Sequence, residues 1–222
     1  MMRSVGVVYL LYFVTATLGQ LCVSRAGISE LGAGPPDAAA VANGVLAHDG
    51  VLRLGFALTM ISIACYVVLI ALFYQLFQAV GRFRAGLAVL FGLVGMTLQA
   101  GAVAAQMAAA TVITTGQARA SAVVLLDIAH QGDGVGLVFD GLFLLLIGDL
   151  IIRSTIVPRV FGVLVALAGL GWLTFLAPTL TSAALPFVEV VGVVAEASLM
   201  LWLLVVGVRR DGAPAVSRTG VA

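Results

Sequence analysis

Long apolar runs fill most of this chain, and they limit the folds it can adopt more than any other feature. A helix needs roughly 20 apolar residues to cross a bilayer, and six runs of about that size lie at residues 5–24, 54–78, 85–107, 134–152, 160–177 and 185–208. In a bilayer, only helices and closed barrels satisfy their backbone hydrogen bonds. Because these runs lack the alternation of barrel strands, the sequence predicts a transmembrane bundle of six helices.

The composition agrees with a membrane protein that has no separate soluble part. The chain has 222 residues, of which 62% are hydrophobic and 9% are charged, whereas a soluble domain is about half apolar and a quarter charged. We therefore expect one all-α integral-membrane domain over residues 1–222, with a cytoplasmic tail at 209–222. The net charge of +1 gives no indication of nucleic-acid binding.

The basic residues predict the orientation. The chain has no lysine, and its 11 arginines are unevenly placed. In a six-span arrangement one side carries Arg3, Arg82, Arg84, Arg153, Arg159, Arg209, Arg210 and Arg218, and the other carries Arg25, Arg53 and Arg119. Since arginine is enriched in cytoplasmic loops, both termini are predicted to be cytoplasmic, in a bacterial inner membrane.

Two loops on the predicted outer side are expected to form short interfacial helices. Asp37 follows two prolines and precedes an Ala-rich run, which is typical of a helix start. In that helix Val41, Val45 and Leu46 would face the membrane surface. A second surface helix is predicted over Ala118–His130.

Small residues recur on single faces of three predicted spans. The positions are Gly92, Gly95 and Ala102, then Gly134, Gly141 and Gly148, then Gly162, Ala166 and Gly169. Such faces let helix backbones approach closely in lipid, so we expect tight helix packing there.

Three acidic residues, Asp140, Glu189 and Glu196, lie within the predicted spans with no basic residue at their depth. Ionisable side chains inside a membrane are costly and mark candidate functional sites. Without a counter-charge these acids must be protonated, bind a cation or face water. They are therefore the candidate catalytic residues.

Polar residues spaced seven apart share a helix face, and three such pairs fall in the outer half of the predicted spans. They are Asp133 with Asp140, Glu189 with Glu196, and Gln99 with Gln106. The pairs predict a polar cavity in which the two glutamines bind substrate. The alternative is that each acid is protonated and only joins neighbouring helices by hydrogen bonds.

Further binding residues are predicted around these acids. Phe139, Phe143 and Trp202 could face a cationic intermediate through their rings. Arg53, at the outer entrance of the second span, is expected to pair with Asp133 or Glu189.

A metal-like pattern, Asp127-x-x-His130-x-x-Asp133, overlaps the end of the second predicted surface helix. A carboxylate and an imidazole three residues apart can converge on one ion, and such ligands suit zinc, iron or manganese. A surface hydrogen-bonding or capping role is the alternative. No other cofactor is indicated.

Three stretches of the chain resemble a family of bacterial six-helix membrane proteins that is catalogued as a domain of unknown function, number 4386. They run from Asp37 to Gly55, from Leu126 through Arg153-Ser154 and Pro158-Arg-Val-Phe-Gly162 to Gly171-Trp172, and from Ala195 to Trp202. The resemblance implies a six-span fold and no established activity.

The preferred hypothesis is that the cavity binds or processes an apolar small molecule, such as a lipid or isoprenoid. Protonated Asp140 and Glu196 could then act as general acids, in the style of membrane terpene cyclases. A proton- or cation-coupled carrier and a non-catalytic assembly subunit are the alternatives. Whether the protein is an enzyme stays open at this point, and membrane lipids are the expected partners.

Overall fold

The computed structural model describes residues 2–25, 27–28, 38–116 and 119–211, and every regular element within them is helical. The elements are α1 (Met2–Arg25), α2 (Ala38–Thr114), α3 (Arg119–Arg153), α4 (Arg159–Trp172), the 3-10 helix η1 (Leu173–Leu176) and α5 (Pro178–Asp211). Five helical stretches among the described residues are apolar and long enough to cross a membrane, the fourth of them formed by α4 together with η1. The all-α prediction is confirmed, and the chain is a multi-pass membrane protein.

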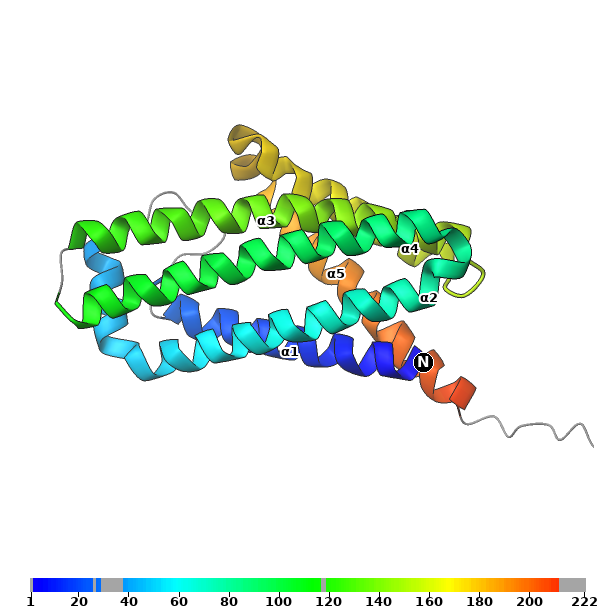
Figure 1. The fold of residues 1–222 in the computed structure, drawn as a ribbon, viewed down its shortest axis with the longest axis horizontal. Coiled ribbons are helices and arrows are strands. Elements are labelled where there is room, and N and C mark those ends of the chain that lie inside the picture. The colour runs from blue at the N-terminus through cyan, green and yellow to red at the C-terminus, as the bar shows by residue number, and fades with distance from the viewer. Residues whose placement is uncertain (1, 26, 29–37, 117–118, 212–222) are drawn as a thin grey trace, which may run out of the picture.

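Helix α2 changes direction twice, because its backbone leaves the helical conformation at His48 (φ −129°, ψ 27°) and at Gly81 (φ −170°, ψ 89°). It therefore consists of three helical segments, 38–47, 49–80 and 82–114. Figure 1 shows that the second and third segments run side by side in opposite directions, and that α3 lies along the third. Gly81 is thus the tip of a helical hairpin.

The segment 38–47 lies across one end of the bundle (Figure 1). Its Val41 and Val45 are buried, with exposed fractions of 2% and 0%, whereas Leu46 is 60% exposed. The prediction that Val41 and Val45 face the membrane surface is therefore wrong, because both side chains pack into the protein. The predicted start at Asp37 lies outside the described residues.

The second predicted surface helix is not a separate element. Helix α3 continues without a break from Arg119 to Arg153, so the glycines after His130 do not end it. They act as contact points instead: a side-chain carbon added to Gly136 would lie 2.9 Å from the Gln99 side chain and 3.1 Å from the Gly95 carbonyl oxygen. Glycine weakens a helix in water, but in a packed membrane bundle it lets backbones approach.

The predicted small-residue faces do bring helices into close contact. A side-chain carbon on Gly148 would lie 2.7 Å from the Gly162 carbonyl oxygen, and one on Gly141 would lie 2.8 Å from that of Gly169. These contacts join α3 to α4 backbone against backbone. The prediction of tight packing at these positions is confirmed.

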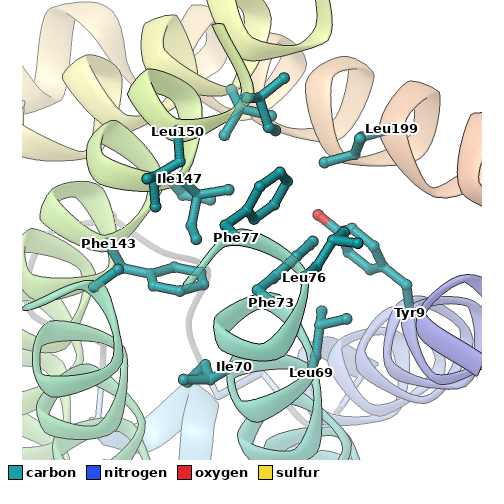
Figure 2. Close-up of a cluster of buried hydrophobic side chains, with 14 of the residues drawn as sticks. Tyr9, Leu69, Ile70, Phe73, Leu76, Phe77, Phe143, Ile147, Leu150 and Leu199 are labelled. Atoms are coloured by element: carbon teal, nitrogen blue, oxygen red, sulfur yellow. The ribbon is translucent and has the colours of Figure 1, made fainter. Parts of the chain in front are cut away.

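Buried apolar side chains form two clusters. The larger one joins all five α-helices around Phe73, Phe77, Phe143, Ile147, Leu150 and Leu199, and Figure 2 shows it with Tyr9 at its edge. The smaller one gathers near the 38–47 segment and contains Val23, Ile28, Val41, Val45, Leu52, Phe56, Val103, Ala109, Ala110, Ala122 and Leu126. The space between the two clusters holds the candidate site.

Candidate functional site

A cavity of about 790 Å³ lies between the two apolar clusters. Its wall includes Val23, Val103 and Leu126 from the smaller cluster and Met96 from the larger one. Ligand pockets for small molecules usually span 300–1,000 Å³, so the cavity has room for one. Side chains of α1, α2, α3, α4 and α5 all contribute to it.

Polar side chains from four helices line this cavity. They are Tyr12, Thr17, Gln20, Thr59, Ser62, Gln99, Gln106, His130, Asp133, Glu189 and Glu196. The structure thus brings together both glutamines and three of the acids that the sequence places in one cavity. Glu189 is exposed and Asp133 is half-buried, whereas Glu196 is only 9% exposed.

Glu196 lies at the end of the cavity that faces the larger apolar cluster. Its neighbours Ala195 and Leu199 belong to that cluster, with exposed fractions of 0% and 1%. The Tyr9 side chain of α1 lies beside the Glu196 carboxyl and interacts with it. One buried acid therefore reaches the cavity while it is held from behind by a tyrosine.

Asp140 is buried just behind the cavity wall rather than in it. It is 7% exposed, and the Tyr66 hydroxyl donates a hydrogen bond of 2.7 Å to its Oδ1. Asp140 and Glu196 are near enough to interact electrostatically. The prediction that Asp140 shares the cavity with Glu196 is therefore corrected: the two acids are neighbours, but only Glu196 lines it.

Three tyrosines connect the two acids. The Tyr12 ring lines the cavity, and its centroid is 4.8 Å from that of Tyr66 and 6.0 Å from that of Tyr9. Tyr9 lies beside Glu196, and the Tyr66 hydroxyl donates a hydrogen bond to Asp140. The site is thus a cluster of two carboxyls and three phenols at one end of the cavity.

Among the described residues no arginine lines this cavity, and the ion pairs lie elsewhere. Arg53 Nε contacts Asp49 Oδ2 at 2.9 Å, so the predicted pairing of Arg53 with Asp133 or Glu189 is wrong. The reason is local, since Asp49 precedes Arg53 by one helical turn. At the other end of the bundle, Asp149 binds Arg84 and Arg153.

The three predicted aromatic residues do not reach the cavity. Phe143 is 1% exposed and packs against Tyr66 and Phe73 in the larger cluster. Phe139 contacts Phe91, and Trp202 contacts Phe161. Each ring packs against a neighbouring helix, and this contact buries its apolar surface without a ligand.

The aromatic residues that do line the cavity are Tyr12, Phe13 and Trp172. Trp172 stands at the end of α4, beside Phe175 and against Gly192 of α5. Its Nε1 is buried and has no hydrogen-bond partner among the described residues.

The metal pattern does not form a centre. No group of three His, Cys, Asp or Glu side chains in the described part of the chain is placed to hold a metal ion. His130 and Asp133 line the cavity, but Asp127 is exposed and does not. The three residues lie on one continuous helix, α3.

Sequence analysis missed the tyrosines of this site, Tyr9, Tyr12 and Tyr66, although the sequence contains a spacing that could have indicated them. Tyr12 precedes Arg25 by the same number of residues as Tyr66 follows Arg53. Because a helix rises by a constant 1.5 Å per residue, two antiparallel spans bring these tyrosines to matched depths. Tyrosine within an apolar span needs a polar partner, and the acids are those partners.

Comparison with known proteins assigns the chain to a family. A family model described as "Domain of unknown function (DUF4386)" matches residues 4–207. The chain belongs to this family. No match was found among curated proteins or among solved structures.

Proposed function

We propose that this protein binds an apolar small molecule, such as a lipid or isoprenoid, in the cavity and that Glu196 acts on it as a proton donor. The observation that carries the proposal is the placement of Glu196. It is buried, it reaches a cavity of about 790 Å³, and its side-chain partner is a phenol rather than a cation. Asp140 lies behind the cavity wall near Glu196 and accepts a hydrogen bond from Tyr66.

In this proposal the chain crosses the membrane six times and both termini are cytoplasmic. The reversal of α2 at Gly81 supports six crossings, because segments 49–80 and 82–114 are each long enough to span. The excess of arginines on the side of the termini supports the orientation. The cavity then opens in the outer half of the bilayer, with 38–47 covering its end as the proposed interfacial helix.

The chemistry follows from the surroundings of Glu196. A charged carboxylate buried without a cation costs several kcal/mol, so the neutral carboxylic acid is the form that this site favours. Its proton can add to one carbon of an alkene, where the π electron pair forms the new C–H bond and leaves a cation on the other carbon. Loss of a proton from a neighbouring carbon ends an isomerisation or cyclisation without an oxidant. Tyr12 and Trp172 are the rings that can face the cation.

A coupled carrier needs a polar path beyond the cavity, and the larger apolar cluster occupies that position. Phe73, Phe77, Leu150 and Leu203 have exposed fractions of 0–3% there. The pocket proposal therefore fits this structure better than the carrier alternative. Ion flux in proteoliposomes distinguishes the two, since the pocket proposal expects none above protein-free vesicles.

Binding can be tested without knowing the ligand. The protein is purified in its membrane lipids, and co-purifying molecules are identified by native mass spectrometry. Ala16→Leu, which puts a larger side chain on the cavity wall, should remove the bound species, and Ala57→Leu on the exposed surface should retain it. An identical set of bound molecules in both variants would refute binding in this cavity.

Proton donation can be tested in D₂O. A membrane lipid extract is incubated with the purified protein, and products are searched for one added deuteron on carbon. Wild type should incorporate deuterium, and Glu196→Gln should reduce the rate by about 10²-fold or more. Binding that persists in wild type without any deuterium uptake would leave a lipid-binding protein and reject the catalytic role.

A further inference from the structure

A second cavity, of about 390 Å³, lies at the hairpin tip of α2, at the end of the bundle opposite the 38–47 segment. It is lined by Val80, Gly81, Arg82, Phe83, Arg84, Leu150 and Arg153. Three of these seven residues carry guanidinium groups. The cavity therefore has the chemistry of an anion site and shares no residue with the acid-lined cavity.

Asp149 holds two of the guanidinium groups in place. Its Oδ2 accepts a hydrogen bond of 2.7 Å from Arg84 Nη1, and its Oδ1 accepts one of 2.8 Å from Arg153 Nε. Arginine has five N–H donors, so both groups keep donors that Asp149 does not use. A carboxylate that orients two arginines in this way prepares them for a second acceptor, such as a phosphate group.

The positive charge at this cavity is not balanced. Arg82 lines it with no ion pair among the described residues, so three guanidinium groups share one carboxylate. Arg82 and Arg84 also lie in the first turn of segment 82–114, where the helix dipole favours anions over cations. A bound anion would relieve both unfavourable interactions.

Phe83 identifies where such an anion comes from. It lies between Arg82 and Arg84, lines the same cavity and is 82% exposed, at the tip of two apolar helical segments. An exposed phenylalanine beside arginines at a membrane surface fits acyl chains next to headgroups. We propose that this cavity binds the phosphate headgroup of an anionic membrane phospholipid, with Phe83 against its glycerol and acyl region. The proposal does not depend on the function of the acid-lined cavity.

The test measures lipid binding by the intact protein in detergent. Phosphatidylglycerol and phosphatidylcholine are titrated separately, and bound lipid is counted by native mass spectrometry. Wild type should bind phosphatidylglycerol more tightly, and Arg82→Gln should weaken that binding about fivefold. Arg159→Gln is the matched control, because Arg159 is also exposed in the first turn of a helix but does not line the cavity.

Two results would overturn the proposal. Equal weakening in Arg82→Gln and Arg159→Gln would mean a general attraction to positive charge and no built site. Inorganic phosphate gives the second: if it competes with phosphatidylglycerol at millimolar concentration and Phe83→Ala changes nothing, the cavity takes a soluble anion instead. For a lipid site, Phe83→Ala should weaken phosphatidylglycerol binding while inorganic phosphate competes poorly.

Discussion

The two ends of this bundle differ in how their interior is filled and in which residues pair with their acids. Around the larger apolar cluster, aromatic and leucine side chains fill the interior (Figure 2). The nearby acid, Asp149, is paired with two arginines. Around the large cavity, the interior is open, and the acids Asp140 and Glu196 are paired with tyrosines. The same five helices build both regions.

This difference separates acids that support the fold from acids available for chemistry. An arginine partner keeps a carboxylate charged and fixed. A phenol donates one hydrogen bond and leaves the carboxyl able to carry a proton. Asp149 therefore belongs to the structure of the hairpin end, whereas Glu196 is in a position to exchange a proton with a ligand.

The largest effect should come from removing a side chain from the filled region. Leu150 is 0% exposed and Leu137, on the same helix, lines the cavity. Leu150→Ala should lower the free energy of unfolding by about 2–5 kcal/mol, and Leu137→Ala by roughly half as much, because one side of Leu137 already lacks neighbours. Unfolding in mixed detergent micelles measures both. Equal losses would mean that the cavity is filled in the native membrane.

The next effect concerns the phenol that holds Asp140. Tyr66→Phe removes the hydroxyl that donates to Asp140 Oδ1 and leaves a buried carboxyl without that partner, at a cost of about 1–3 kcal/mol. Asp140→Asn keeps an oxygen that can accept from Tyr66, so it should cost less than half as much. Thermal unfolding of the two variants ranks them. A larger loss for Asp140→Asn would show that the charge of Asp140, rather than its hydrogen bond, stabilises this region.

The sequence was sufficient to predict an all-helical chain with several long apolar helices, and it named some of the residues that line the cavity. Apolar runs indicate spans without any tertiary information, and the seven-residue spacing correctly grouped Glu189 with Glu196 and Gln99 with Gln106. The same spacing misplaced Asp140 relative to Asp133. Seven residues also advance a helix by about 10 Å, and at the depth of Asp140 its carboxyl is bound by Tyr66 of α2. Such a contact between helices cannot be predicted from spacing within one helix.

The parts that could not be predicted depend on contacts between helices. Which helix face meets which neighbour decides that Tyr9 reaches Glu196 and Tyr66 reaches Asp140, and no single span contains that information. The continuity of α3 through Gly136 has the same origin, since the close approach of Gly95 stabilises a helix that glycine would weaken in water.

A smaller effect is expected from the paired acid of the hairpin end. Asp149→Asn weakens two ion pairs whose side chains are 36–55% exposed, so solvent screening limits the loss to about 1 kcal/mol. Adding salt should reduce the difference between wild type and variant, as it screens exposed pairs. A salt-independent loss above that size would mean that the Asp149 cluster is buried by lipid and contributes as a desolvated network.

The smallest effect should come from Glu189, the exposed acid of the cavity. No ion pair or hydrogen bond involves its side chain among the described residues, so Glu189→Gln should change the free energy of unfolding by no more than about 0.5 kcal/mol. In D₂O the variant should also retain most of the deuterium incorporation, because Glu189 lies about two helical turns away from Glu196 on α5. If Glu189→Gln instead abolishes incorporation while Glu196→Gln does not, the exposed acid is the proton donor. The acids paired with tyrosines would then stabilise the fold, as Asp149 does with its arginines.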